Sequence, residues 1–397
     1  MKRFFQKFTL VLSVFCMALL GVTGWLGHTL PGRFSLSRQG SVTLPTQLPM
    51  VLTTHSENST TATVRLFGIF PVAEPAVELS GETYVVPGGT PFGIKIFADG
   101  VLIIGTGSVT TPQGSQNPAR QAGIRQGDLI SKVNGYTVNT NAALQKLVAA
   151  SGGKALRLQV RREGKTFGAE ITPVKDKAGV YRLGLWVRDS TAGLGTLTFY
   201  DPVTGVYGGL GHGVCDADTG ELMPILSGEI LSATVVGIKK ATAGTAGELK
   251  GMLNDSKKLG TLAINTATGV YGVLNSVPTG QTVRVARKQE VQTGAATLLC
   301  SVDGHTRSYT CKITRVHLEN KEHKDMVIKI TDDRLLTAAG GIVQGLSGSP
   351  ILQNGTLVGA VTHVFVNDPQ KGYAIFAETM WETAQGVANE NKLKEAS

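Results

Sequence analysis

The chain has 397 residues, a length typical of two or three domains. It contains 50 glycines and only 6% aromatic residues, which indicates many turns and short strands rather than long helices. The net charge is +9, but the basic residues are scattered, without long runs or interleaved aromatic residues. This distribution argues against nucleic-acid binding and favours attraction to an anionic membrane surface.

The N-terminus has the pattern of a membrane anchor. Lys2, Arg3 and Lys7 precede an uncharged segment at residues 8–26, about the minimum length for a bilayer span. The basic flank places the N-terminus in the cytosol. We interpret residues 1–28 as a signal anchor rather than a cleaved signal peptide, because the end of the run matches an Ala-x-Ala-type site poorly. Both interpretations place the rest of the chain outside the cytosol.

Residues 29–80 differ in composition from the flanking segments. They are rich in Ser and Thr, with scattered Pro. We expect a flexible tether that contains one short strand at residues 64–70.

Residues 81–175 have the pattern of one small α+β domain. A glycine-rich loop leads into Ile94-Lys95-Ile96, Asn134-Gly135 indicates a hairpin, and residues 141–150 have helical spacing. The string Ala-Gly-Ile…Gly-Asp-Leu-Ile…Val-Asn-Gly resembles a PDZ domain. The resemblance implies that the loop and the strand after it bind a peptide C-terminus; the alternative is a PDZ fold that only packs against its neighbour. The residues assigned to this binding site are Gly88, Gly89, Phe92, Gly93, Ile94, Lys95 and Ile96.

Two similar segments follow. Residues 195–208 and 260–272 each read as a strand, a turn ending in Thr-Gly and a second strand. Two equivalent hairpins predict two related β-units, which fits the double β-barrel of trypsin-like proteases; chance similarity is the alternative. Cys300 and Cys311 flank a polar stretch suited to a hairpin, where they could form a disulfide or remain separate thiols.

Ser347 has the surroundings of a nucleophile. It lies in a Gly-x-Ser-Gly-x-Pro frame, and flanking glycines permit the tight turn that presents a hydroxyl outward. In trypsin-like enzymes the oxyanion is bound by two backbone N–H groups, which here would be those of Gly345 and Ser347. A Gly/Ser-rich hairpin corner is the alternative.

His212 is the best candidate for the general base, because it lies between glycines at the expected end of a strand. His363 follows on an apolar strand, where it could line a substrate pocket, although we favour a buried core histidine. The carboxylate that orients the base would be Asp332 or Asp333, either of which could instead cap a helix. No cluster shows metal-ligand spacing, so we expect no metal or other cofactor.

The whole order closely resembles the stage IV sporulation protein B (SpoIVB) peptidase family. The match is most specific at residues 209–213, 340–351 and 359–369. The resemblance implies a serine endopeptidase domain at residues 176–397. It places the catalytic histidine on His212, the serine on Ser347 and the aspartate on Asp332, although neighbouring Asp333 stays open.

The resemblance also implies a location and a substrate. Such proteins cross the inner forespore membrane and act between the two forespore membranes. They cleave a membrane-bound regulator of an intramembrane metalloprotease, which releases processing of pro-sigma-K, and they cleave themselves near the N-terminus. Two alternatives are a DegP/HtrA-like quality-control protease, whose protease domain precedes its PDZ domain, and a non-catalytic PDZ scaffold.

Overall fold

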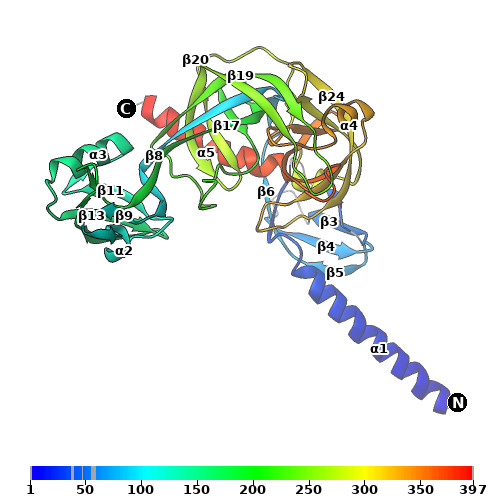
Figure 1. Cartoon of the computed structure of the whole chain (residues 1–397). Helices are drawn as coiled ribbons and strands as arrows, with labels where there is room; N and C mark the ends of the chain where they lie inside the picture. Colours follow the sequence, from blue (N-terminus) through cyan, green and yellow to red (C-terminus); the bar gives the residue numbers. More distant parts are fainter. Residues whose placement is uncertain (1, 37–39, 47, 55–59, 396–397) are drawn as a thin grey trace.

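The computed structural model describes residues 2–36, 40–46, 48–54 and 60–395. Helix α1 (Lys2–Gly27) projects away from the rest of the molecule (Figure 1). Its segment Gln6–Gly27 is exposed and, by length and composition, apolar enough to cross a membrane. This helix is consistent with the single-pass anchor that the sequence predicts.

The segment after α1 is folded, which differs from the flexible tether that we expected. Leu44, Leu52, Leu66 and Phe34 are buried together in one apolar cluster, whereas Ser41 and Thr43 are exposed. The Ser/Thr content therefore reflects strands with one polar face, not disorder. A parallel pair is formed by β1 (Arg33–Leu36) and β6 (Ala76–Leu79), and an antiparallel sheet by β2 (Ser41–Leu44), β3 (Met50–Thr54), β4 (Ala62–Leu66) and β5 (Phe70–Ala73).

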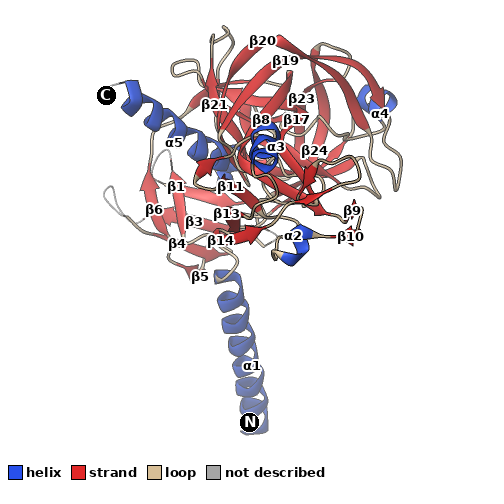
Figure 2. Cartoon of the chain, turned by 60° about the vertical axis from the view of Figure 1, so that its left-hand side comes forward, coloured by secondary structure: helices blue, strands red, loops and turns tan. Residues whose placement is uncertain are grey.

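The first of two β-barrels follows (Figure 2). Its six strands pair in a closed ring, because β17 also pairs with β8. In ring order they are β8 (Pro91–Thr106), β19 (Ser227–Lys239), β20 (Glu248–Thr266), β21 (Gly269–Leu274), β18 (Val206–Gly209) and β17 (Leu185–Tyr200). Two short strands, β7 (Tyr84–Pro87) and β22 (Val283–Arg284), extend the sheet beside β17.

The two similar hairpins both lie in this first barrel. They are β17–β18 and β20–β21, and they are neighbours because β18 pairs with β21. We had inferred that the repeated pattern marks two related β-units, one for each barrel. The structure instead places both hairpins in the same barrel.

The second barrel is also a closed ring of six strands. Its core contains Cys300 and Cys311 as buried free thiols, which answers the question of the disulfide. In ring order its strands are β23 (Gly294–Ser301), β24 (Thr306–Val316), β25 (Met326–Ile330), β28 (Lys371–Phe376), β27 (Thr356–Val364) and β26 (Pro350–Gln353). The remaining helices of this part are η1 (Lys288–Glu290), α4 (Asp333–Ala339) and α5 (Ala377–Glu395).

The PDZ lobe is inserted into the first barrel. It lies between β8 and β17, and these long strands belong to the lobe at one end and to the barrel at the other. In Figure 1 it forms a separate lobe on the left. Its elements are β9 (Val109–Thr111), β10 (Gly114–Gln116), α2 (Pro118–Gln121), β11 (Leu129–Val133), β12 (Tyr136–Thr137), α3 (Asn141–Ala150), β13 (Leu156–Arg162), β14 (Lys165–Ile171), β15 (Val174–Lys175) and β16 (Tyr181–Arg182).

This insertion corrects the domain boundary that we placed at residue 81. The stretch of β8 before Ala98 pairs with β17 and β19 of the barrel, whereas Val101 and Ile103 enter the PDZ core. The two barrels together with the PDZ domain confirm the mainly β fold class.

A buried arginine attaches the N-terminal module to the barrels. Arg287 donates to the backbone of Ser80 and Gly81 and pairs with Glu378 at 3.2 Å. Arg287 and Glu378 are 8% and 3% exposed. We predict that Arg287→Ala lowers the free energy of unfolding by about 3 to 5 kcal/mol, because it leaves the Glu378 carboxylate buried without its cation. Urea unfolding followed by the fluorescence of Trp381 on the same helix measures this loss.

The matched control is Arg33→Ala. Arg33 pairs with Glu78 at 3.5 Å, but both side chains are more than 60% exposed. Its loss is expected to cost less than about 1 kcal/mol. Equal effects of the two substitutions would contradict the structural role of Arg287.

Candidate active site

Ser347 lies in the loop between α4 and β26. Gly345 and Gly348 have φ angles of +95° and +93°, a region that favours glycine. A Cβ atom on Gly348 would lie 2.0 Å from the carbonyl oxygen of Thr196. The Gly-x-Ser-Gly frame is therefore required both by the turn and by the close approach of the first barrel.

Two backbone amides of this loop are not engaged. Among the described residues, the N–H groups of Gly345 and Ser347 have no hydrogen-bond acceptor, whereas those of Leu346, Gly348 and Ser349 each have one. Unpaired amide donors on both sides of a serine are the arrangement that an oxyanion requires. The geometry therefore suits the two donors that the sequence predicts.

The histidine loop reaches Ser347 from the first barrel. Leu210 and Gly211 have φ angles of +67° and +69°, so the chain turns sharply just before His212. A Cβ atom on Gly348 would lie 2.5 Å from the Leu210 nitrogen, and one on Gly211 would lie 3.0 Å from the Thr362 side chain. The two loops, more than a hundred residues apart in sequence, are thus in contact.

The serine and the histidine are not hydrogen-bonded to each other in this conformation. The Ser347 hydroxyl donates to the Thr362 carbonyl at 2.7 Å, and His212 Nδ1 lies 2.8 Å from the Gly213 carbonyl oxygen. Burial lowers the pKa of His212, and the hydrogen bond to Gly213 opposes this shift. The imidazole is therefore neutral near pH 7, the state that a general base needs.

His363 is not the buried core histidine that we favoured. Its side chain is exposed, and its ring stacks on that of His212 with centroids 4.8 Å apart. Stacking on His212 partly removes water from the ring, and this desolvation together with the charge of His212 lowers the pKa of His363 below its ordinary value. His363 therefore forms part of the site as a neutral ring beside the catalytic candidate.

Asp332 is not brought to His212. Its carboxylate accepts hydrogen bonds from the Arg334 side chain, the Arg334 backbone and the backbone N–H of Thr310, as the N-cap of α4. The hydrogen bond from Arg334 is the largest cause that holds the pKa of Asp332 well below its usual range. In this structure Asp332 fixes the helix that leads into the serine loop, while Asp333 occupies the first turn of that helix.

The residues predicted to bind peptide in the PDZ domain lie elsewhere. Gly88 and Gly89 donate their N–H groups to the carbonyls of Thr198 and Leu197. Residues 92–96 are paired with β17 on one edge and β19 on the other. A strand that is paired on both edges cannot accept a peptide, so the predicted site from Gly88 to Ile96 is part of the barrel wall.

A groove of about 660 Å³ in the PDZ domain has the required form instead. It lies between α3, which contributes Leu144 and Val148, and residues 185–187 at the start of β17. Those residues pair with β8 on one edge, and the described strands supply no partner on the other. Leu183-Gly184-Leu185 leads into this edge, and our sequence analysis did not assign it to the peptide site.

Comparison with known proteins identifies the family. The family model described as SpoIVB peptidase S55 matches residues 179–381, just over half of the chain, and a PDZ-domain model matches residues 107–172. The chain belongs to the SpoIVB peptidase S55 family. The chain therefore combines the domain of a peptidase family with a PDZ domain.

Similarity to individual proteins is partial. Zinc metalloprotease RasP of Geobacillus kaustophilus is 35% identical over 63 residues, which are 16% of this chain and 14% of that protein. LL2128 of Lactococcus lactis is 37% identical over 89 residues, 22% of this chain and 19% of that protein. The chain thus spans about a fifth or less of these relatives.

Similarity to solved structures also covers only part of the chain. The active form of the Rv3671c protease of M. tuberculosis is 14% identical, with a TM-score of 0.29, and the match covers 50% of this chain and 74% of that chain. The PDZ domain of the SdrC-like protein of Listeria monocytogenes is 22% identical, with a TM-score of 0.19, and the match covers 23% of this chain and 90% of that chain.

Two roles of Asp332 can be tested separately: the helix cap that its side chain forms and the negative charge that a catalytic triad requires. Asn caps helices as well as Asp, but it lacks the charge that a triad requires. From the contacts in this structure we predict that Asp332→Asn retains kcat within about 10-fold, whereas Asp332→Ala also loses about 1 kcal/mol of stability with the cap. A loss of about 10⁴-fold in kcat for the Asn variant at unchanged stability would instead place the carboxylate on His212 during catalysis.

The lowered pKa of His212 predicts the pH dependence of activity. A general base works when neutral, so kcat/KM should rise with pH. The pH at which it reaches half its maximum should lie below the ordinary histidine pKa of about 6.5. A pH profile of peptide cleavage measures the midpoint, and the rate of labelling of Ser347 by a phosphonate should follow the same curve. A midpoint above the ordinary value would contradict the burial of His212.

Proposed function

We propose that this SpoIVB-family peptidase is a membrane-anchored enzyme that cleaves itself and a membrane-bound regulator of an intramembrane metalloprotease. One observation carries its chemistry: the serine loop has two unengaged amides beside Ser347 and is in contact with the loop of His212. The location between the two forespore membranes and the release of pro-sigma-K processing follow from the family resemblance.

The proposed reaction is acyl transfer to Ser347. The hydroxyl turns from the Thr362 carbonyl towards His212, which takes its proton as Oγ attacks the scissile carbonyl. The N–H groups of Gly345 and Ser347 bind the oxyanion. His212 then protonates the leaving amine, and water repeats the sequence on the acyl-enzyme. His212 and Ser347 are the catalytic pair in this proposal.

The PDZ groove between α3 and β17 is proposed to hold a peptide of the substrate or of a regulatory partner. The open edge at residues 185–187 suits β-strand addition. Leu144 and Val148 offer an apolar surface for one side chain of that peptide. Such tethering raises the effective concentration of substrate at the serine.

Anchoring explains how a membrane-bound substrate is reached. Helix α1 would hold the barrels at the outer surface of the membrane, and a regulator in the same membrane diffuses in two dimensions towards them. Self-cleavage is proposed between residues 28 and 81. Within this segment, residues 37–39, 47 and 55–59 lie outside the described residues. A cut there separates the barrels from the anchor.

The position of the PDZ domain favours this proposal over a DegP/HtrA-like protease. The PDZ domain follows the protease in such enzymes, whereas here it is inserted within the strands of the first barrel. A non-catalytic scaffold is disfavoured because it does not require unengaged amides next to an accessible serine.

Self-cleavage by the full chain in membranes or detergent tests the proposal. We expect Ser347→Ala to lose self-cleavage and phosphonate labelling, with a rate roughly 10³- to 10⁶-fold lower. Ser349→Ala is the matched control, because the Ser349 hydroxyl is buried without a hydrogen-bond partner among the described residues. It should retain wild-type activity within about 3-fold, because removing this hydroxyl breaks no hydrogen bond among the described residues.

N-terminal sequencing of the product locates the cut. A new N-terminus between residues 28 and 81 is expected from the wild type and from Ser349→Ala, but not from Ser347→Ala. Active protein with only an intact N-terminus would contradict self-cleavage. Rapid degradation of unfolded casein would support the quality-control alternative, and retained signalling by Ser347→Ala would support the scaffold.

A further inference from the structure

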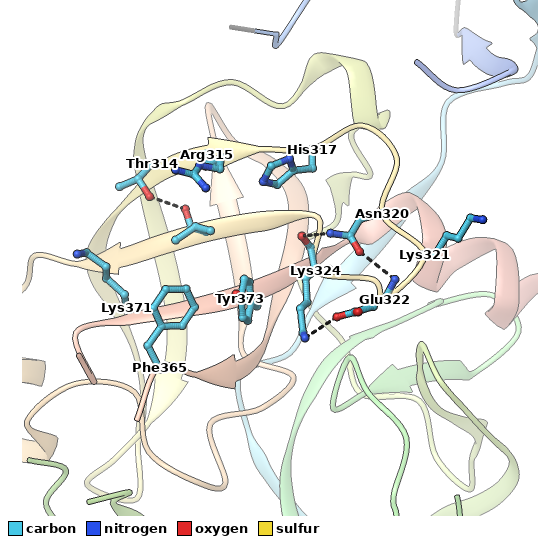
Figure 3. Close-up of a pocket in the computed structure, with 11 residues that line it drawn as sticks. Thr314, Arg315, His317, Asn320, Lys321, Glu322, Lys324, Phe365, Lys371 and Tyr373 are labelled. Atoms are coloured by element: carbon cyan, nitrogen blue, oxygen red, sulfur yellow. Dashed lines mark hydrogen bonds and ion pairs between the residues drawn. The ribbon is translucent and has the colours of Figure 1, made fainter. Parts of the chain in front are cut away.

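A basic pocket lies on the second barrel, and Phe365, which lines it, is two positions after His363. Its volume is about 840 Å³. Figure 3 shows its side chains coming from β24, β25, β28 and the segment that follows β27. None of the predicted site residues lies in it.

The pocket combines an aromatic surface with cationic side chains. The rings of Phe365 and Tyr373 have centroids 4.6 Å apart, and Lys324 Nζ lies 5.2 Å from the centroid of Tyr373. In Figure 3, Arg315 and His317 lie on one side of these rings and Lys371 and Lys324 flank them. This arrangement provides apolar contact for an aliphatic stem and positive charge for its end.

The positive charge of the pocket is only partly neutralised. Lys324 pairs with Glu322 at 2.6 Å, and Lys371 pairs with Asp368 at 2.8 Å. Within the described part of the chain, no carboxylate pairs with Arg315 or Lys321, which also line the pocket. The pocket therefore has two cations in excess and is complementary to an acidic group.

The pocket adjoins the end of β27, the strand that contains Thr362 and His363. Phe365 follows His363 by two residues, and His363 stacks on His212. The positive charge of Lys324 contributes to the lowered pKa of His363. On one edge of β27, β26 pairs as far as Ala360 and the serine loop bonds to Val361. No described strand pairs with this edge beyond Val361, so an extended substrate can lie along β27 from Thr362, which Ser347 contacts.

The spacing along β27 places an acidic residue of the substrate. Phe365 is three positions after Thr362, which is about 10 Å along an extended strand. We propose that this pocket binds an Asp or Glu side chain about three residues from the scissile bond, and that it gives the peptidase a preference for acidic substrates. The inference rests on the proposed peptidase activity of Ser347. Its place beside the serine favours a substrate peptide over a lipid headgroup.

A pairwise peptide library tests the proposal on the full-length protein. Each internally quenched peptide carries Glu at one position, and its partner carries Gln there. For the wild type we expect a Glu/Gln ratio in kcat/KM of about 3 to 10 at one position on one side of the cleaved bond. The ratio should fall towards one at high salt, because salt screens partly exposed charges.

The double variant Arg315→Gln/Lys324→Gln should reduce the ratio to about one. The matched control is the double variant Lys165→Gln/Lys154→Gln, which removes two cations from the PDZ domain and should keep the wild-type ratio. Because each ratio compares two peptides on the same protein, a general loss of folding or activity cancels. A ratio near one in the wild type, or an unchanged ratio in the pocket variant, overturns the proposal.

Binding to the Ser347→Ala protein separates this inference from the proposed function. Fluorescence anisotropy should show tighter binding of the Glu peptide than of its Gln partner even where no cleavage occurs. Equal binding of both peptides overturns the pocket assignment, whatever the activity. Inhibition by short-chain phosphatidylglycerol that depends on Arg315 and Lys324, with no Glu preference, would assign the pocket to lipid headgroups instead.

Discussion

The serine loop of the second barrel is held in place by a threonine of the first. The Thr196 N–H donates to the Ser347 carbonyl at 2.9 Å, and its hydroxyl donates to the Gly345 carbonyl at 2.8 Å. These bonds hold the loop at Gly345 and Ser347, whose own N–H groups have no acceptor among the described residues. Thr198 adds a third such bond, to Gly348. The conformation of the serine loop therefore depends on the contact between the barrels, not on the loop alone.

Strand β17, which carries Thr196, also enters the PDZ domain. Its first residues line the peptide groove, and its last residues hold the serine loop. At the junction, Arg188 pairs with buried Asp216 and with Asp218 at 2.7 Å, in the segment that follows His212. Gln126 of the PDZ domain donates to the Asp218 carbonyl. The PDZ domain is thus connected to the segment that follows His212 and, through β17, to the serine loop.

Local motifs were predicted well because their geometry is encoded locally. The glycines around Ser347 and before His212 are needed by backbone angles and close contacts at those positions, so the residue types themselves carry the information. The PDZ string was found for the same reason. The division of β8 between two domains was not predicted, because Ile94 and Ile103 are equally apolar. Only the packing partners show that Ile94 lies in the barrel and Ile103 in the PDZ core.

The third member of the site shows a different limit. Asp332 was chosen by its place in the chain order, but a carboxylate before a helix also satisfies that helix's N-cap. Arg334, two residues later, offers a guanidinium within 2.8 Å, and two local partners outcompete a distant imidazole unless the chain moves. No linear pattern distinguishes these cases.

His212 itself is positioned without a carboxylate in the described structure. Its contacts are the Gly213 carbonyl and the His363 ring. A half-buried imidazole without an anion beside it is a weaker base than one in a complete triad, because its cation is not stabilised. The Ser347 hydroxyl, bonded to the Thr362 carbonyl, is likewise turned away from it. In this conformation both groups are bonded to backbone carbonyls, so a hydrogen bond between them requires the Ser347 hydroxyl to turn away from Thr362. The PDZ domain contacts the segment after His212 and shares β17 with the residues that hold the serine loop, so one strand connects the PDZ domain to the contact between the barrels.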